Sequence, residues 1–289
     1  MNNRKFSSMP PQFQPEPQPQ IQPKTFYLPG VGELLSESFQ VYKSRIGVFL
    51  GIMIIPILIF LLILLPVVFF GYYYLLQGLN INPLLLGLLM AVFGIIMAIT
   101  SLWISVSLLY AIKEREQKIG IKESLAKGWH KIISYLWISI LSGFIIGGGF
   151  LLLIIPGIII ALWFSLAAYV LVSEDLKGMN VLFRSKQLIK GYWGKVFWRF
   201  LVLGLIMWLI TFIVQLIPLI GAVIINLFVT PFSFVFIFLV YENLKRLKGE
   251  VPLEPPKRKT KIGFTLLGIL GFLFISAILA SIVFLFFSP

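Results

Sequence analysis

Charged and uncharged positions occur in long separate blocks along this chain. Four stretches contain no Lys, Arg, Asp or Glu: Ile46–Ile112, Ile132–Ser173, Phe200–Tyr241 and Ile262–Pro289. A transmembrane helix needs about 20 predominantly apolar residues, and a charged side chain is costly at the bilayer centre. The pattern therefore predicts that each stretch is buried in lipid and that the protein is an integral membrane protein.

Turns that contain Pro or Gly divide three of these stretches. The first breaks at the polar sequence 78–83, the second at Pro156-Gly157 and the third at 218–221. Because these residues interrupt helices and favour turns, each of the three stretches is predicted to hold two spans. The last stretch is long enough for a single span. We therefore expect an all-α fold, a polytopic transmembrane helical bundle of about seven spans.

A repeated unit accounts for the first six spans. Each copy begins with an amphipathic segment that carries a Ser and nearby basic or aromatic residues, and these serines are Ser38, Ser124 and Ser185. Each returning span carries an aromatic residue followed by Ser, at Trp103/Ser105, Trp163/Ser165 and Phe232/Ser233. An amphipathic segment beside a span is typical of a helix that lies in the membrane interface. The sequence predicts three helical-hairpin repeats, each preceded by an amphipathic interfacial helix.

These patterns define the domain organisation. Residues 1–30 are rich in Pro and Gln and are predicted to form a disordered cytoplasmic tail, which could bind a protein partner. The six-span membrane domain covers 31–245, with its repeats at 31–112, 120–173 and 178–245. A basic cytoplasmic linker, 246–261, leads to the C-terminal transmembrane helix at 262–289. Small residues spaced four apart, Gly47/Gly51 and Gly143/Gly147, predict close helix packing.

The distribution of basic residues predicts the orientation. All 24 Lys and Arg residues fall on one side if the N-terminus is cytoplasmic, and the predicted turns on the other side carry none. The positive-inside rule then places the N-terminus in the cytoplasm and the C-terminus outside. Tyr72, Tyr73 and Tyr74 lie at the predicted outer boundary, where aromatic residues are enriched. We expect a multi-pass protein of a prokaryotic plasma membrane.

Composition narrows the function classes. The chain is 59% hydrophobic and 12% charged, it has no Cys, and its net charge is +13. The absence of Cys excludes disulfides and thiolate chemistry within the chain. The excess of basic residues flanks spans and forms no compact basic domain, so we expect no nucleic-acid binding. Basic residues beside spans instead favour contact with anionic lipid headgroups, and the candidates are Lys43, Arg45, Lys127, Lys131, Arg184, Lys186, Lys190 and Lys195.

Within the spans the polar residues are uncharged. The candidates for a polar intramembrane site are Ser105, Ser165, Gln215, Asn226 and Ser233. Ser can satisfy its hydroxyl on the i−4 carbonyl of its own helix, so a structural role is expected for most of them. Gln215 and Asn226 are costlier in lipid and are expected to face the bundle interior, where they could bond each other across the fifth and sixth spans.

The sequence offers no catalytic constellation. The one histidine, His130, has no second His or Cys to share a metal with, and it lacks an identifiable nucleophile and orienting acid. The acidic residues Glu114, Glu116, Glu174 and Asp175 lie among Lys and Arg and are interpreted as loop charges. We therefore expect a protein that is not an enzyme and that needs no metal and no other cofactor.

Two segments resemble a known family. They are Pro156–Asp175, which contains Trp163 and Ser165, and Ser185–Trp193, and the stretch Leu34–Leu50 fits the same pattern. Over residues Gly32–Asn243 the chain resembles the polytopic membrane domain attached to some bacterial glycerophosphoryl diester phosphodiesterases, and related stand-alone prokaryotic membrane proteins. The resemblance implies a membrane domain without the catalytic domain, which in that family is a separate soluble barrel. The basic linker and the seventh span depart from the family's six-span pattern.

Two functions remain open at this point. The first is a non-catalytic membrane scaffold or lipid-interacting protein whose basic cytoplasmic face contacts anionic membrane lipids or a protein partner. The alternative is a transporter or permease-like component for a lipid or small amphiphile, which would need a cavity that reaches Gln215 and Asn226.

Overall fold

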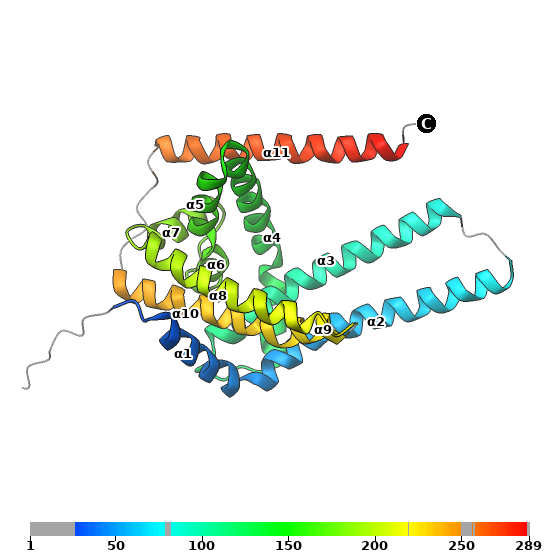
Figure 1. Ribbon diagram of the computed structural model, residues 1–289, viewed down its shortest axis with the longest axis horizontal. Coiled ribbons are helices and arrows are strands. Elements are labelled where there is room, and N and C mark those ends of the chain that lie inside the picture. Colours follow the sequence, from blue (N-terminus) through cyan, green and yellow to red (C-terminus); the bar gives the residue numbers. More distant parts are fainter. Residues whose placement is uncertain (1–26, 79–81, 219, 250–255, 257, 288–289) are drawn as a thin grey trace, which may run out of the picture.

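A computed structural model describes residues 27–78, 82–218, 220–249, 256 and 258–287. All regular secondary structure in these residues is helical (Figure 1). The elements are α1 (Val31–Ser44), α2 (Ile46–Leu76), α3 (Pro83–Lys113), α4 (Ile121–Leu152), α5 (Ile154–Phe164), α6 (Ala167–Ser173), α7 (Met179–Ile189), α8 (Trp193–Val214), α9 (Ile220–Ile224), the π-helical turn η1 (Ile225–Val229), α10 (Thr230–Lys248) and α11 (Arg258–Phe287). Residues 1–26 of the predicted tail and 250–255 of the predicted linker lie outside the described residues.

The expected all-α membrane fold of about seven spans is confirmed. Seven helical segments within the described residues are long and apolar enough to cross a membrane. They are Ile46–Leu76, Pro83–Lys113, Ile121–Leu152, Ile154–Ser173, Trp193–Val214, Ile220–Lys248 and Arg258–Ile278. Each begins or ends close to a boundary that the uncharged stretches and their Pro- or Gly-containing turns predict.

Local sequence explains where these helices begin and end. Pro83 occupies the first turn of α3, and the Asn82 side chain before it accepts a hydrogen bond from the Leu84 backbone N–H at 2.9 Å. The α4–α5 break falls at Leu153, whose backbone is extended, three residues before Pro156. Pro56 and Pro66 lie inside α2, which nevertheless remains one helix of 31 residues.

The three amphipathic segments are not equivalent in the structure. α1 and α7 are separate helices, whereas the second segment, residues 121–131, runs without a break into the span of α4. The residues that follow account for the difference between the second and third segments. Gly191 adopts a positive φ of 88° after α7 and redirects the chain before α8. No Gly or Pro separates Lys131 from the apolar residues of α4, so nothing in the sequence stops that helix.

The buried core lies where the second, or returning, helices of the three hairpins meet, namely α3, α5–α6 and α10. This is the end of the molecule that carries the charged residues between the spans, and it is called the charged end below. The C-terminal half of α3 packs against α6 and α10. Fully or almost fully buried residues there include Leu108, Leu109, Ile112, Val170, Leu171, Val235, Phe236 and Leu239. Because lipid tails are as apolar as these side chains, their contribution inside a bilayer comes from close van der Waals packing between the helices. Close packing at this end of the bundle therefore fixes the helices that carry the charged side chains.

Each amphipathic segment packs on the returning helix of the preceding predicted repeat, and the order closes into a ring. The first turns of α4 lie on α3, α7 lies on α5 and α6, and α1 lies on α10. Ser38, Ser124 and Ser185 are fully buried in these contacts. Because the last returning helix holds the first amphipathic segment, the arrangement is cyclic rather than a linear array.

Corresponding aromatic residues make the three contacts of this ring. The indole N–H of Trp103 donates a hydrogen bond to the Leu125 carbonyl at 2.8 Å. The Trp163 carbonyl accepts one from the Ser185 hydroxyl at 2.6 Å. The ring of Phe232 packs edge-on against Tyr42, with centroids 6.1 Å apart. The aromatic–Ser pattern of the sequence thus marks the positions on each returning helix that contact the amphipathic segment of the next repeat around the ring.

Apolar surface covers the rest of the molecule. The α2–α3 hairpin extends away from the charged end, and most of its large apolar side chains are exposed, as expected for a lipid-facing surface (Figure 1). In the same view α4 and α5 run steeply across the direction of α2, α3, α8 and α10. α11 crosses α4 and contacts it closely through glycines.

Candidate functional site

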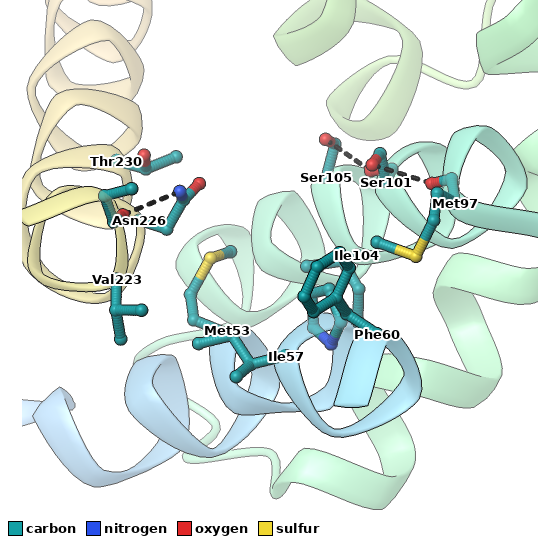
Figure 2. A pocket seen from close by; sticks show the side chains of 12 residues that line it. Met53, Ile57, Phe60, Met97, Ser101, Ile104, Ser105, Val223, Asn226 and Thr230 are labelled. Atoms are coloured by element: carbon teal, nitrogen blue, oxygen red, sulfur yellow. Dashed lines mark hydrogen bonds between the residues drawn. The ribbon is translucent and has the colours of Figure 1, made fainter. Parts of the chain in front are cut away.

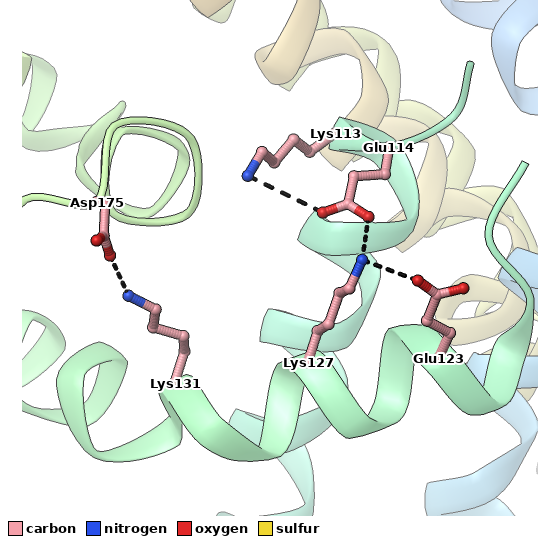
Figure 3. Close-up of polar contacts among 6 residues, drawn as sticks. All are labelled: Lys113, Glu114, Glu123, Lys127, Lys131 and Asp175. Atoms are coloured by element: carbon pink, nitrogen blue, oxygen red, sulfur yellow. Dashed lines mark hydrogen bonds and ion pairs between the residues drawn. The ribbon is translucent and has the colours of Figure 1, made fainter. Parts of the chain in front are cut away.

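Two of the eight predicted basic residues are paired within the protein (Figure 3). Lys127 on α4 forms ion pairs with Glu114, at the end of α3, and with Glu123, the latter at 2.9 Å. Lys131, one turn further on, pairs with Asp175 in the α6–α7 loop, and this hydrogen bond lowers the pKa of the Asp175 carboxyl. These lysines join α4 to its neighbours, so their charges are largely neutralised within the bundle.

Arg184 is also paired, and it is buried. Its Nε donates to a carboxylate oxygen of Glu174 at 2.6 Å, and only 7% and 12% of the two side chains are exposed. The other Glu174 oxygen accepts a hydrogen bond from the Tyr241 hydroxyl at 3.0 Å and lies 3.8 Å from the Lys245 ammonium. Glu174 thereby connects α6, α7 and α10 and is a structural hub, not a simple loop charge.

Two more predicted lipid contacts face the protein. Arg45, between α1 and α2, donates a hydrogen bond to the Ile119 carbonyl in the α3–α4 loop. The Lys186 ammonium lies over the rings of Trp163 and Phe264, 4.1 and 4.8 Å from their centroids. These are cation–π distances. Burial, with a smaller effect of Lys190, lowers the pKa of Lys186.

The three remaining candidates are exposed. Lys43 lies in the last turn of α1, and Lys190 and Lys195 flank the α7–α8 junction. No acidic residue in the described part of the chain pairs with them. Large aromatic side chains at the same end of the molecule are more than half exposed, namely Phe39, Trp129, Trp137 and Trp198. Exposed cations beside exposed aromatic rings are the composition of a membrane interface.

Two arginines that were not among the candidates also stabilise the charged end. Arg115 makes a bidentate contact with Glu242 on α10, at 2.8 and 3.3 Å. Arg199, which is buried in α8, donates to the carbonyls of Leu28 at 2.9 Å and of Pro29 at 3.0 Å. In the sequence, Arg199 is recognisable only as a single Arg at the edge of an apolar stretch. Its partners could not be predicted, because they are backbone carbonyls about 170 residues away.

The polar residues of the spans divide between structural roles and a cavity. The hydroxyls of Ser105, Ser165 and Ser233 donate to carbonyls of their own helices at 2.7–2.9 Å, as expected. Gln215 is exposed at the end of α8 rather than in the bundle interior. Asn226 is also exposed, so the expectation that it faces the bundle interior is wrong as well. Its amide donates to the Ala222 carbonyl of its own helical run at 2.9 Å, and the expected bond to Gln215 is absent from the described hydrogen bonds.

Asn226 lines a cavity with a volume of about 420 Å³ (Figure 2). Its walls come from α2, α3 and the run α9–η1–α10. Apolar side chains dominate the lining, among them Met53, Ile57, Phe60 and Ile104. Ser101, Ser105 and Thr230 add hydroxyl groups. The cavity therefore lies among spans and carries no charged side chain in its wall.

The described residues offer no metal centre. No group of three His, Asp or Glu residues in this part of the chain could hold a metal ion. His130 is exposed, and its Nδ1 lies 2.7 Å from the Ala126 carbonyl of its own helix.

Comparison with known proteins gives no relative: no protein-family model, no curated protein and no solved structure matches the chain.

Proposed function

We propose that this integral membrane protein is a non-catalytic scaffold that binds anionic phospholipid headgroups on its cytoplasmic face. The observation that supports the proposal is the exposed set Lys43, Lys190 and Lys195, which lacks acidic partners in the described part of the chain. Basic residues near a membrane surface each contribute about 1 kcal/mol of attraction to anionic lipid. The ion pairs and hydrogen bond of Glu174 join α6, α7 and α10 and so fix α7, which Lys190 follows directly.

The headgroup proposal predicts the behaviour of a triple variant, Lys43→Gln/Lys190→Gln/Lys195→Gln. Its affinity for short-chain phosphatidylglycerol should fall by roughly a hundredfold at low salt, because three attractions of about 1 kcal/mol each are removed. The measurement is a titration of the detergent-solubilised protein, repeated at high salt, where the parent protein should lose most of its preference. Short-chain phosphatidylcholine serves as the uncharged comparison.

A matched variant tests whether exposure rather than total charge matters. Lys127→Gln/Lys131→Gln removes two lysines whose charges are already paired with Glu114, Glu123 and Asp175. It should leave the affinity for phosphatidylglycerol within about twofold of the parent value. If the triple variant and the parent bind phosphatidylglycerol equally, with the same salt dependence, headgroup binding is rejected and a protein partner becomes the better explanation of the basic face.

The proposal includes an orientation, with the N-terminus in the cytoplasm and the C-terminus outside a prokaryotic plasma membrane. The natural chain contains no Cys, so single cysteines can report it directly. Gln77, at the exposed turn after α2, and Ser44, at the exposed end of α1, suit this experiment. A membrane-impermeant maleimide added to intact cells should label Gln77→Cys and spare Ser44→Cys until the cells are lysed. The reverse pattern would invert the topology.

The resemblance to the membrane domain of glycerophosphoryl diester phosphodiesterases is part of this proposal. It supports a membrane module of this kind, and the all-α fold is compatible with it. A permease-like role for a lipid or small amphiphile is the second candidate, and the cavity lined by Asn226 supports it.

A further inference from the structure

The cavity lined by Asn226 has the dimensions of a ligand site. At about 420 Å³ it lies in the range of pockets that enclose small molecules. It is bounded by three separate parts of the chain, α2, α3 and the run α9–η1–α10, so its shape depends on the packed bundle (Figure 2). Each of these parts belongs to an apolar candidate span, which means that a ligand would enter from the bilayer.

The helix is distorted where Asn226 lies. Residues Ile225–Val229 form a π-helical turn, a rare distortion that often occurs at functional sites. The Asn226 amide nitrogen is directed back toward the Ala222 carbonyl, and its oxygen is turned toward the cavity (Figure 2). The described hydrogen bonds give this oxygen no partner. An amide oxygen among apolar side chains gains free energy when a donor reaches it.

The hydroxyl groups that line the cavity donate their hydrogens to backbone carbonyls. Ser101 donates to the Met97 carbonyl at 2.8 Å and Ser105 to the Ser101 carbonyl at 2.7 Å. Thr230 donates to the Ile225 carbonyl at 3.4 Å, across the π-helical turn. A hydroxyl that donates its single hydrogen keeps only acceptor capacity. The hydroxyl oxygens of Ser101 and Thr230 and the Oδ1 of Asn226 therefore remain able to accept a hydrogen bond. The Ser105 hydroxyl differs, because it also interacts with the Tyr135 hydroxyl.

The presence of acceptor oxygens and the lack of charged side chains in the wall indicate which kind of ligand the cavity can bind. No Lys, Arg or His lines the cavity to receive an anionic group, and no carboxylate lines it to neutralise a cation. We propose that the cavity binds one neutral lipid that carries a free hydroxyl group, with the hydroxyl donated to Asn226 Oδ1 and the hydrocarbon packed against the apolar walls. Met53 and Met97 favour such an occupant because flexible thioether side chains adapt to chains of irregular shape.

Photolabelling of the full-length protein in phosphatidylcholine nanodiscs tests this site. The probe is hexadecanol with a diazirine in its chain, and the comparison probe is its methyl ether, which has the same chain and no donor. The alcohol should label peptides from α2, α3 and η1 about fivefold more strongly than the ether, because one neutral hydrogen bond separates the two. Asn226→Leu should reduce alcohol labelling to the level of the ether.

Asn243 provides the matched control. Its side-chain nitrogen also donates to the i−4 carbonyl, that of Leu239 at 2.9 Å, but it lies at the charged end of α10 outside the cavity wall. Asn243→Leu should keep full alcohol labelling. Equal labelling by alcohol and ether in the natural protein, or unchanged alcohol labelling in Asn226→Leu, would overturn the proposal. The lysine triple variant should label normally, which separates this site from headgroup binding.

Discussion

Replacing Glu174 by Gln is expected to lower the free energy of unfolding by about 3 kcal/mol. The substitution keeps the size of the side chain but leaves the Arg184 guanidinium buried without its counter-charge, and loss of one partner of a buried pair costs about 3–5 kcal/mol. The new amide also presents a donor where the carboxylate accepts hydrogen bonds from both Arg184 and Tyr241. The measurement is unfolding in mixed micelles with increasing SDS, followed by tryptophan fluorescence.

The neighbouring residue supplies the control for this prediction. Asp175 also forms an ion pair, with Lys131, but 82% of its side chain is exposed. Exposed pairs contribute little to stability, so Asp175→Asn should unfold almost like the parent protein. Removal of both charges in Glu174→Leu/Arg184→Met should cost less than the sum of the two single changes, because neither side chain then remains charged after losing the other. Equal unfolding of Glu174→Gln and Asp175→Asn would show that Glu174 is not a hub.

The number of membrane spans could be predicted from the sequence for a simple physical reason. Lipid excludes charge along the whole length of a span, so the uncharged stretches and their Pro- or Gly-containing turns carry the signal locally. The position of the break near Pro156 follows from the same kind of local signal. The continuity of the second amphipathic segment with α4 was missed, because amphipathic character predicts a helix without saying where it ends.

The candidate basic face was predicted too broadly because a sequence does not show which charges are paired. Lys127 and Lys131 look like lipid contacts in the sequence. Lys127, however, pairs with Glu114, 13 residues away at the end of α3, as well as with nearby Glu123, and Lys131 pairs with Asp175, 44 residues away after α6. The same limit applies to Arg199, whose partners are backbone carbonyls. Which amphipathic segment lies on which returning helix also depends on tertiary contacts, so the ring that α1 closes on α10 was not foreseen.

Glycine spacing was correct for Gly51, where a Cβ would lie 2.3 Å from the Ile121 side chain at the start of α4, but it selected the wrong residues on α4 itself. Gly143 and Gly147 have the expected spacing on α4, but a Cβ at either would meet nothing within 4 Å. The close approach to α11 is made by Gly148, where a Cβ would lie 2.0 Å from the Leu267 carbonyl oxygen. The spacing selected Gly147 because Gly143 lies four residues before it, whereas Gly148 has Phe144 at that distance. Which glycine of the run is used depends on the partner helix.

Gly271→Val is therefore expected to separate α11 from α4. A Cβ at this position would lie 2.0 Å from the Phe144 carbonyl oxygen and 2.9 Å from the Gly148 nitrogen, both of them backbone atoms that cannot move aside cheaply. Overpacking of this kind costs about 1–3 kcal/mol, which at the upper end is sufficient to shift the docking equilibrium of one helix by roughly a hundredfold. The contact is replaced by lipid, since the exposed faces of both helices are apolar.

Cross-linking measures this separation directly in a chain that has no natural Cys. The rings of Phe144 and Phe272 pack edge-on with centroids 5.4 Å apart, so Phe144→Cys/Phe272→Cys should react rapidly with a short bismaleimide. Adding Gly271→Val should slow this reaction at least about tenfold, given a docking penalty above 1.4 kcal/mol. Adding Gly147→Val, on α4 but in open space, should leave the rate unchanged. A Gly271→Val protein that cross-links at the parent rate would mean that α11 does not depend on this glycine contact, and that the aromatic contacts of Phe264 with Phe164 and Phe183 hold the helix instead.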